Sequence, residues 1–373
     1  MKYLAILGRL PEISQAELEA QFGGRAQIKC EKLAIFTAPN LNEEDAPKID
    51  RLGGVLKLGY LPDEPILDFL QNLPAGRITL GVSNYSGKKA EAEREAIKLK
   101  QKLSKMGRKV RIVPNKNAEL STATAHYNKL GRKPLCVEIL MLGKERFISL
   151  GAQNIVAYAK RDQARPARDA KIGMLPPKLA QMLINLNGSL ARGVRVLDPF
   201  CGTGVVLQEA ALMGYEPIGS DLNPRMIEYS KKNLKWLKQR FSLTNIDLSD
   251  IIEGDAVHTK WPKRIEAVAC ETYLGPPMSQ PPVDIKLKTV KRECSEIVLG
   301  FLKNINAQIE PGVPLTLAVP AWLRPDGSYS RMNILDEIEG LGYNVMKHSG
   351  KRSLLYFREG QIVAREIISL RKK

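Results

Sequence analysis

The sequence predicts an α/β protein: a parallel sheet covered by helices on both faces, with an antiparallel edge, preceded by smaller α+β regions. Two observations lead to this prediction. From residue 179 onward, short apolar runs alternate with amphipathic stretches, as strands and helices do when they alternate along a chain. A glycine-rich turn at residues 196–204 lies where a buried strand should pass into a helix. The 373 residues exceed what one hydrophobic core usually serves, so we expect two or three compact units.

The first unit is expected over residues 1–60. A short apolar strand at residues 3–7 precedes a helix over residues 15–21, for which Ser14 supplies the N-cap side chain. A second strand is predicted over residues 28–36. Together these elements form a small α+β module.

A second α+β unit is expected over residues 61–158. Residues 78–82 alternate apolar side chains with polar or small ones, as a half-buried strand does. Over residues 89–106, apolar positions recur at spacings of three and four, which predicts an amphipathic helix with lysines on its outer face. Strands at residues 135–142 and 147–152 complete the unit.

The third unit is expected over residues 179–373, after a linker. We interpret residues 159–178 as that linker because they are too rich in Arg, Lys and Pro for a core element. Near the end of the chain, residues 343–347, 353–358 and 362–370 are predicted to be successive strands, which would give the sheet its antiparallel edge.

The charge is concentrated in one part of the chain. The sequence holds 57 basic and 40 acidic residues, a formal net charge of +17. Residues 101–200 alone hold 19 Lys and Arg against 6 Asp and Glu, which is +13 of that total. Such a concentration suits a polyanion, and nucleic acid is the natural candidate. A basic surface that only keeps the protein soluble is the alternative interpretation.

Cysteine usage and hydropathy indicate a compartment. The five cysteines are scattered without a CxxC pair, which favours a reducing environment and argues against structural zinc. The apolar run at residues 3–7 is too short for a secretion signal or a membrane span, and Arg9 closes it. We therefore expect a cytoplasmic protein with no metal site and no membrane association.

The segment VLDPFCGTG, residues 196–204, is the sharpest signal in the sequence. Gly202 and Gly204 allow the backbone to bend tightly and approach a ligand, while Asp198 at the strand end can receive a cationic amine. A dinucleotide fingerprint of the GxGxxG type would need glycine where this chain has Leu207. The close approach of a helix to a pyrophosphate is therefore not provided for.

Two further aspartates follow at predicted strand ends. Asp221 can accept both ribose hydroxyls of a nucleoside, and Asp255 can meet the adenine amine. Three carboxylates at successive strand ends form the pattern of an S-adenosylmethionine cleft. The predicted cofactor-binding residues are Asp198, Pro199, Phe200, Gly202, Thr203, Gly204, Asp221, Leu222, Asp255 and Ala256.

Blander interpretations exist for several of these residues. Strand-end aspartates are often only caps or turn formers, and this holds for each of the three taken alone. Cys201 and Cys270 are possible thiol nucleophiles, but neither has a histidine close in sequence, so buried packing is favoured for both.

With these motifs in the third unit, a basic α+β unit before it and RDQARP between them, the chain resembles the THUMP-domain tRNA methyltransferases that modify the exocyclic amine of a guanosine. The likeness spans nearly the whole chain. MKYLAILGRLPEISQAELEA resembles the family's ferredoxin-like start, AHYNKLGRKPLCVEIL the end of its THUMP module, and LDPFCGTGVVLQEA with GSDLNPRM its cofactor segments. The resemblance implies a Rossmann-like class I methyltransferase domain over residues 179–373, preceded by ferredoxin-like and THUMP modules. It also implies a tRNA whose acceptor end the THUMP module grips.

Members of that family carry an Asp-Pro-Pro-aromatic motif at the end of the fourth strand, whose carboxylate accepts the hydrogens of the target amine. This chain reads ETYLGPP over residues 271–277, so Glu271 replaces the aspartate and the proline pair comes later. The resemblance makes Glu271 the catalytic candidate and Tyr273 a platform for a flipped base. The alternative is that Glu271 caps a turn and Tyr273 fills the core.

The predicted RNA contacts are basic side chains of the second unit and the linker: Lys129, Arg132, Lys133, Arg161, Arg165, Arg168 and Lys171. For the four in the linker, a solvated segment is the alternative. The expected function is S-adenosylmethionine-dependent methylation of structured RNA, with guanosine N2 of a tRNA favoured. An RNA-binding protein with a degenerate methyltransferase domain, and an amino-methyltransferase acting on DNA, stay open, as does a small protein partner.

Overall fold

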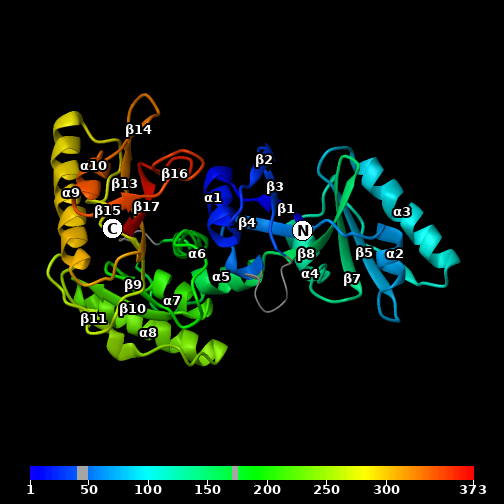
Figure 1. The fold of residues 1–373 in the computed structure, drawn as a ribbon, viewed down its shortest axis with the longest axis horizontal. Coiled ribbons are helices and arrows are strands. Elements are labelled where there is room, and N and C mark those ends of the chain that lie inside the picture. The colour runs from blue at the N-terminus through cyan, green and yellow to red at the C-terminus, as the bar shows by residue number, and fades with distance from the viewer. Residues whose placement is uncertain (40–48, 170–174) are drawn as a thin grey trace. The chain divides into compact units, whose positions relative to one another are not determined.

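The computed structural model describes residues 1–39, 49–169 and 175–373. Contacts between residues divide the chain into two compact units, Met1–Ala159 and Lys160–Lys373 (Figure 1). Each unit is built around its own β-sheet. Across the described residues, every helix is too short or too polar to cross a membrane.

An eight-stranded mixed sheet forms the centre of the first unit. Its strands are β1 (Lys2–Leu7), β2 (Gln27–Cys30), β3 (Leu33–Thr37), β4 (Val55–Tyr60), β5 (Ile78–Asn84), β6 (Val110–Ile112), β7 (Cys136–Leu142) and β8 (Glu145–Ala152). They follow the spatial order β2-β3-β1-β4-β8-β7-β5-β6. Because β4 pairs with both β1 and β8, one sheet continues across residue 60, where the sequence suggested a boundary. The single strand expected over residues 28–36 is instead the hairpin of β2 and β3.

Along the chain, the helices of the first unit alternate with these strands or follow them. They are α1 (Pro11–Phe22), the 3-10 turn Ile49–Arg51, α2 (Ile66–Gln71), α3 (Lys89–Lys105), α4 (Thr122–Tyr127) and α5 (Ile155–Gln163), which ends beyond Ala159. The amphipathic helix α3 is confirmed, since its apolar stripe is buried. The prediction that Ser14 caps α1 is wrong. Pro11 starts the helix one turn earlier, and the buried Ser14 Oγ donates to the Leu10 carbonyl at 3.1 Å.

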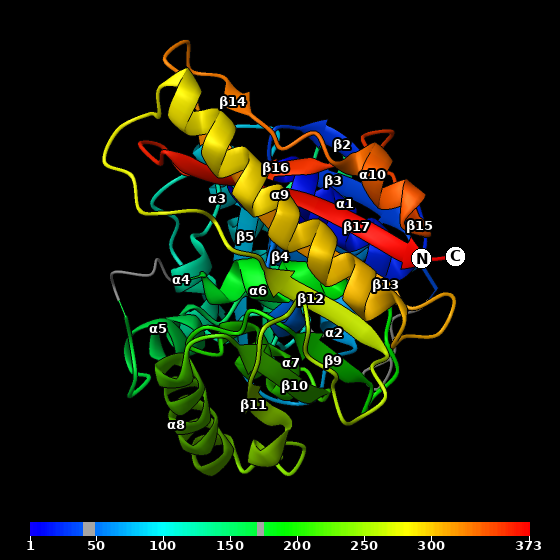
Figure 2. The same cartoon turned by 90° about the vertical axis from the view of Figure 1, so that its left-hand side faces the viewer.

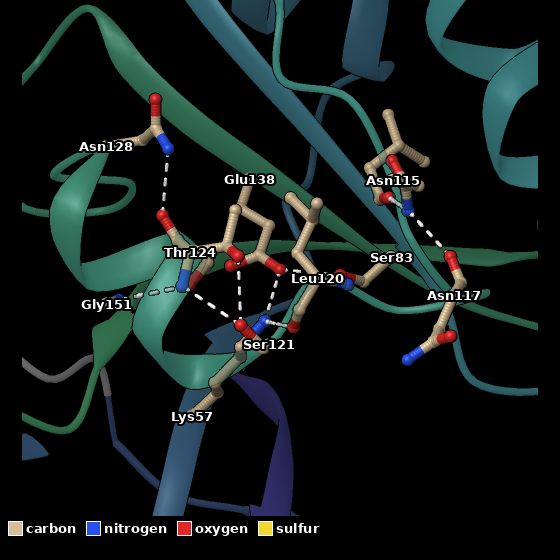
Figure 3. A network of polar contacts seen from close by, with 12 residues as sticks. Lys57, Ser83, Asn115, Asn117, Leu120, Ser121, Thr124, Asn128, Glu138 and Gly151 are labelled. Atoms are coloured by element: carbon tan, nitrogen blue, oxygen red, sulfur yellow. Dashed lines mark hydrogen bonds and ion pairs between the residues drawn. The ribbon is translucent and has the colours of Figure 1, made fainter. Parts of the chain in front are cut away.

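A buried polar network joins three strands of the first sheet to the segment before α4 (Figure 3). Lys57 of β4 and Glu138 of β7 form an ion pair whose side chains are 2% and 0% exposed. Lys57 Nζ also donates to the Leu120 carbonyl at 2.7 Å, and Ser83 Oγ donates to Glu138 Oε1 at 2.6 Å. The Leu120 N–H in turn donates to Ser83 Oγ at 2.9 Å. Because a buried charge is costly unless it is paired and hydrogen-bonded, these four groups have to stay together.

A nine-stranded sheet forms the second unit. Its strands are β9 (Arg195–Asp198), β10 (Glu216–Asp221), β11 (Ile251–Glu253), β12 (Ala267–Glu271), β13 (Pro314–Leu323), β14 (Tyr329–Ser330), β15 (Tyr343–Val345), β16 (Leu354–Tyr356) and β17 (Val363–Lys372). The main order is β11-β10-β9-β12-β13-β17-β15, with β14 beside β13 and β16 beside β17. Strands β9 to β13 pair in parallel, and β17 is antiparallel to β13. The predicted α/β sheet with an antiparallel edge is confirmed.

Helices cover both faces of the second sheet. They are α6 (Pro177–Asn185), α7 (Val205–Leu212), α8 (Pro224–Phe241), the 3-10 turn Leu248–Asp250, α9 (Asp284–Asn306) and α10 (Leu335–Gly340). α7 and α8 contact each other and strands β9 to β11, whereas α9 contacts β13 and α10. Figure 2 shows α9 running across β13 and β17. The strand order reverses between β9 and β12, and in such sheets ligands bind outside the carboxyl ends of the strands at that point.

The residues expected to be a linker pack with the second unit where the structure describes them. Arg161 Nε donates to Glu209 Oε1 of α7 at 2.7 Å, and the two side chains are 8% and 1% exposed. The backbone of Ala167 bonds through both its N–H and its carbonyl to the Asn233 side chain of α8, at 2.9 Å each. Charge and proline content misled the prediction because the matching acid lies 48 residues away.

Candidate functional site

A cavity of 920 Å³ lies in the second unit at the carboxyl ends of β9, β10 and β12. Of the predicted cofactor-binding residues, all but Gly204 line it: Asp198, Pro199, Phe200, Gly202, Thr203, Asp221, Leu222, Asp255 and Ala256. Both predicted catalytic residues, Glu271 and Tyr273, line it as well. Segments up to 75 residues apart in the sequence thus meet in one hollow, as the parallel sheet predicts.

The glycine turn after β9 forms one wall. Gly202 and Gly204 have φ angles of 50° and 78°, a region that glycine enters at no steric cost, and Gly204 is the N-cap of α7. Helix α8 holds the turn from behind. Ser230 Oγ donates to the Gly202 carbonyl at 2.7 Å, and Asn233 Nδ2 donates to the Thr203 carbonyl at 2.9 Å. A Cβ on Gly204 would meet Ser230 Oγ at 2.8 Å, so this position requires glycine for space as well as for backbone angle.

The three aspartates are turn formers and cavity residues at once. Each accepts the backbone N–H two positions onward: Asp198 from Phe200 at 3.1 Å, Asp221 from Asn223 at 2.9 Å and Asp255 from Val257 at 3.0 Å. Asp221 Oδ2 also accepts the Gly202 N–H at 2.8 Å, which ties β10 to the glycine turn. The blander interpretation therefore describes their local geometry correctly. It leaves unexplained why all three carboxylates meet at one cavity.

Asp198 is the most buried of the three, at 2% exposure. Burial raises the pKa of its carboxyl well above the usual range, the Phe200 N–H lowers it, and Asp221 and Glu271 raise it further. Among the described residues, no basic side chain forms an ion pair with it. Such a group favours a cationic ligand, because a positive charge beside it would relieve the repulsion between the carboxylates.

Glu271, at the end of β12, has a cation behind it that the sequence did not indicate. Arg365 of β17 donates from Nε to Glu271 Oε1 at 2.7 Å, with side chains 6% and 14% exposed. Burial raises the pKa of the Glu271 carboxyl, and Arg365 opposes that rise through its charge and its hydrogen bond. The arrangement places a carboxylate at the cavity wall and holds one of its oxygens still.

The segment after Glu271 leads away from the strand along the cavity. The Thr272 N–H donates to the Ala318 carbonyl of β13 at 3.0 Å and keeps the chain extended. Tyr273 is 43% exposed, so the alternative that it fills the core is wrong. Gly275 has a φ of 86°, and a Cβ there would meet Val290 Cγ1 at 2.8 Å. The bend at this glycine brings Pro276 and Pro277 back to the cavity lining.

Cys201 and Cys270 are packing residues, as the sequence favoured. Both are buried, and burial raises the pKa of each thiol well above its usual range. Cys201 also lies within 3.6 Å of Ser230 Oγ. A thiol that resists ionisation is a poor nucleophile.

The predicted RNA-contacting residues divide into three groups. Arg161 and Arg165 are 7% and 3% exposed, so the prediction that their side chains contact phosphates is wrong. Glu209, the acidic partner of Arg161, is buried with it. Lys129, Lys133 and Arg168 are exposed. The third group consists of Arg132 and Lys171. Arg132 is held by Asp50 at 2.6 Å, and Lys171 lies outside the described residues.

Several lining residues were missed. Val257 and Thr272 adjoin predicted positions, and Asn223 and Pro224 come directly after Leu222, so their signal was available in the sequence. Arg365 had none, because it lies 94 residues from Glu271.

Comparisons with known proteins agree with this geometry. Residues 165–252 match the family model described as RMKL-like, methyltransferase domain. The protein named tRNA (guanine(10)-N2)-dimethyltransferase from Methanothermobacter thermautotrophicus is 30% identical over 193 residues, which cover 51% of this chain and 52% of that relative. The protein of the same name from Pyrococcus abyssi is 26% identical over 285 residues, 74% of this chain and 78% of the relative. The chain thus spans about half the length of the first relative.

Among solved structures, TrmN from Thermus thermophilus aligns over 100% of both chains, at 20% identity and a TM-score of 0.46. The family model and the named relatives confirm the resemblance inferred from the sequence. Together with the strand order, they confirm a Rossmann-like methyltransferase domain in the second unit. The family model does not extend into the first unit.

Proposed function

We propose that this chain, a relative of the tRNA (guanine(10)-N2)-dimethyltransferases, methylates an exocyclic amine of a nucleoside in structured RNA, using S-adenosylmethionine. A tRNA is the favoured substrate, and guanosine N2 the favoured atom. One observation carries the proposal. The carboxylates that end β9, β10 and β12 share a 920 Å³ cavity with a glycine turn.

The lining fits S-adenosylmethionine. Gly202 lines the cavity, and a Cβ built on it has only the Phe200 carbonyl oxygen within 4.0 Å, so the missing side chain leaves room for a ligand. Asp221 would hold the ribose hydroxyls, and the apolar side chains of Leu222 and Val257 would flank the adenine. Asp198 would face the cationic end of the molecule. Leu222 is 71% exposed, a large apolar surface that a bound ring would cover.

When bound, S-adenosylmethionine would supply an electrophilic methyl group, which leaves the protein to orient the amine that attacks it. Glu271 accepts hydrogen bonds from that amine and stabilises the positive charge that grows on its nitrogen. Arg365 keeps the Glu271 carboxylate in one orientation. Tyr273 offers an exposed ring on which the target base stacks once it has left the helix.

The first unit would hold the RNA. We assign residues 61–158 to the THUMP module and residues 1–60 to the ferredoxin-like module, although the two share one sheet. Exposed Lys129 and Lys133 in the first unit, and Arg168 in the second, are the proposed phosphate contacts. An enzyme that modifies tRNA would work in the cytoplasm.

The test measures methyl transfer from labelled S-adenosylmethionine to unmodified tRNA, followed by mass spectrometry of the nucleosides. We expect incorporation at one nucleoside with the wild-type chain. We expect Glu271→Gln to lower kcat by about a hundred- to a thousandfold while cofactor affinity stays within about twofold. Exposed Glu310 provides the matched control, because Glu310→Gln removes the same charge away from the cavity.

The outcomes separate the proposal from its two alternatives. Wild-type chain that binds the cofactor and tRNA but transfers no methyl group would favour an RNA-binding protein with a degenerate domain. Faster transfer to duplex DNA than to tRNA would favour a DNA amino-methyltransferase. Glu271→Gln with the activity of Glu310→Gln would remove Glu271 from the mechanism.

A further inference from the structure

Helix α8 is the most one-sidedly charged helix of the second unit. It holds six basic side chains, Arg225, Lys231, Lys232, Lys235, Lys238 and Arg240, against one acidic side chain, Glu228. By comparison, α9 holds five basic and three acidic residues over its longer span. The basic cluster of α8 lies outside residues 101–200, where most of the net charge is found.

The buried stripe of α8 fixes which way these side chains face. The residues packed inward are Met226, Ile227, Ser230, Asn233, Leu234 and Leu237. The outward ridge consists of the exposed basic side chains Arg225, Lys232, Lys235 and Arg240, and Tyr229 and Trp236 lie half-buried beside them. The ridge is about 22 Å long, from the rise of an α-helix, and Trp236 beside it also packs against the core of the second unit.

Contacts at the first turn of α8 leave the Arg225 guanidinium exposed and only weakly paired. The Arg225 guanidinium lies 5.1 Å from the centre of the Tyr229 ring, and its Nη2 donates to the Tyr229 hydroxyl at 2.8 Å. The Arg225 side chain remains 61% exposed, and its ion pair with Asp169 is long, at 3.8 Å. Lys232 and Lys235 are exposed. Lys238, by contrast, donates to the Ile246 carbonyl and is excluded from the ridge.

The ridge begins at the cavity. Pro224 and Met226, in the first turn of α8, line the same hollow as Asp221 and Glu271. The ridge therefore starts at the rim of the hollow that the target nucleotide would enter.

We propose that the outward ridge of α8 is a docking surface for the backbone of the substrate RNA beside its target nucleotide. This rests on the proposed function, which it deepens by naming a further RNA-contacting surface in the second unit. Basic side chains neutralise phosphates and release their counterions. The partly exposed Tyr229 ring beside Arg225 suits an unpaired strand, because every base has a face that stacks. The partner that fits this surface is therefore an RNA strand opened around the target.

The test compares the full-length wild-type chain with Lys232→Ala/Lys235→Ala, using a labelled tRNA transcript over a series of salt concentrations. Loss of two phosphate contacts on a single strand should flatten the plot of log affinity against log salt by about 1.4. Exposed Lys303 of α9 and Lys347 after β15 give the matched control, because Lys303→Ala/Lys347→Ala removes the same charge from elsewhere on the second unit. Cofactor binding by calorimetry should be the same in all three proteins.

Each outcome decides one point. A flattened slope in the α8 variant alone supports the docking surface, even if the wild-type chain transfers no methyl group and the proposed activity fails. Equal slopes for the α8 variant and the control variant overturn the docking surface, even if methylation proceeds. A wild-type chain without affinity for tRNA also overturns the docking surface. So does an α8 variant that loses affinity for duplex DNA but keeps its affinity for tRNA.

Discussion

Each unit of the molecule buries an ion pair in its sheet, and the two pairs differ in what surrounds the acid. In the first unit, Glu138 Oε1 accepts from both Lys57 and Ser83, and the carboxylate is 0% exposed. In the second unit, Glu271 accepts from Arg365 and remains 14% exposed at the wall of a cavity. The chemistry of the two pairs is similar, yet only one acid can meet a ligand.

Open space beside the carboxylate, more than its charge, therefore distinguishes a structural ion pair from a candidate catalytic one. Lys57 and Glu138 are enclosed by the network of Figure 3 and can only stabilise the fold. Asp198 is a third buried acid to compare with Glu138 and Glu271. It is buried at the same cavity and, among the described residues, has no basic partner of its own, so its cation would come from a bound ligand.

The largest effect is expected from breaking the enclosed pair. Glu138→Ala leaves Lys57 buried without its acid, which should destabilise the protein by about 3–5 kcal/mol. Urea unfolding followed by circular dichroism measures this. Glu145→Ala is the matched control, because its pair with Lys2 is 35% and 38% exposed and should contribute at most about 1 kcal/mol. Equal losses in both variants would contradict the structural role of the network.

Removing the cation of the second pair should instead change a pH profile. Arg365 lowers the pKa of Glu271, so Arg365→Ala should raise it. Because the proposed mechanism needs the ionised carboxylate of Glu271, the acidic limb of the rate profile should move up by about 1–3 pH units, the range for an opposite charge. Arg365→Lys should restore part of the shift. If the acidic limb of the rate profile is unchanged in Arg365→Ala, Arg365 does not act on the pKa of Glu271 and only packs in the fold.

Asp198, which has no basic partner among the described residues, predicts an affinity for S-adenosylmethionine that depends on pH. A cation binds the ionised form of Asp198, whose pKa burial raises in the free protein. Below that pKa a proton must leave on binding, so affinity should rise by about tenfold per pH unit and level off above the pKa. Calorimetry in buffers of different ionisation enthalpy measures the released proton. Affinity that is flat with pH, with no proton release, would show that Asp198 does not face the cation.

A smaller effect should separate two glycines, one in each unit. Gly204 and Gly107 have φ angles of 78° and 81°, so alanine at either position costs about 1–2 kcal/mol of backbone strain. At Gly107 a Cβ meets nothing within 4 Å, whereas at Gly204 it meets Ser230 Oγ at 2.8 Å. Gly204→Ala should therefore lose more stability than Gly107→Ala and should weaken cofactor binding. Thermal unfolding and calorimetry compare them, and equal losses would mean that Ser230 moves aside.

The glycine turn and its aspartates could be predicted because each signal is local. A strand end, a glycine pair and an acidic residue lie within a few positions of one another in VLDPFCGTG, and a parallel sheet gathers such ends at one edge. The alternation of elements predicted the second sheet for the same reason.

Pairings across long stretches of chain could not be predicted. Arg365 and Glu271 are 94 residues apart, and Lys57 and Glu138 are 81 apart. Arg161 was assigned to RNA because its local sequence is basic, although its partner Glu209 takes it into the interior. Sequence patterns report the spacing of side chains along one element, whereas the choice of cation for each buried acid depends on which strands the fold sets side by side.

The contact between β12 and β17 also has a consequence for the chain as it is made. Synthesis runs from the N-terminus, so Glu271 leaves the ribosome 94 residues before the guanidinium that restrains it. Until β17 joins the edge of the sheet, Glu271 lacks the hydrogen bond from Arg365. The glycine turn at residues 196–204 is therefore synthesised well before the strand that restrains Glu271.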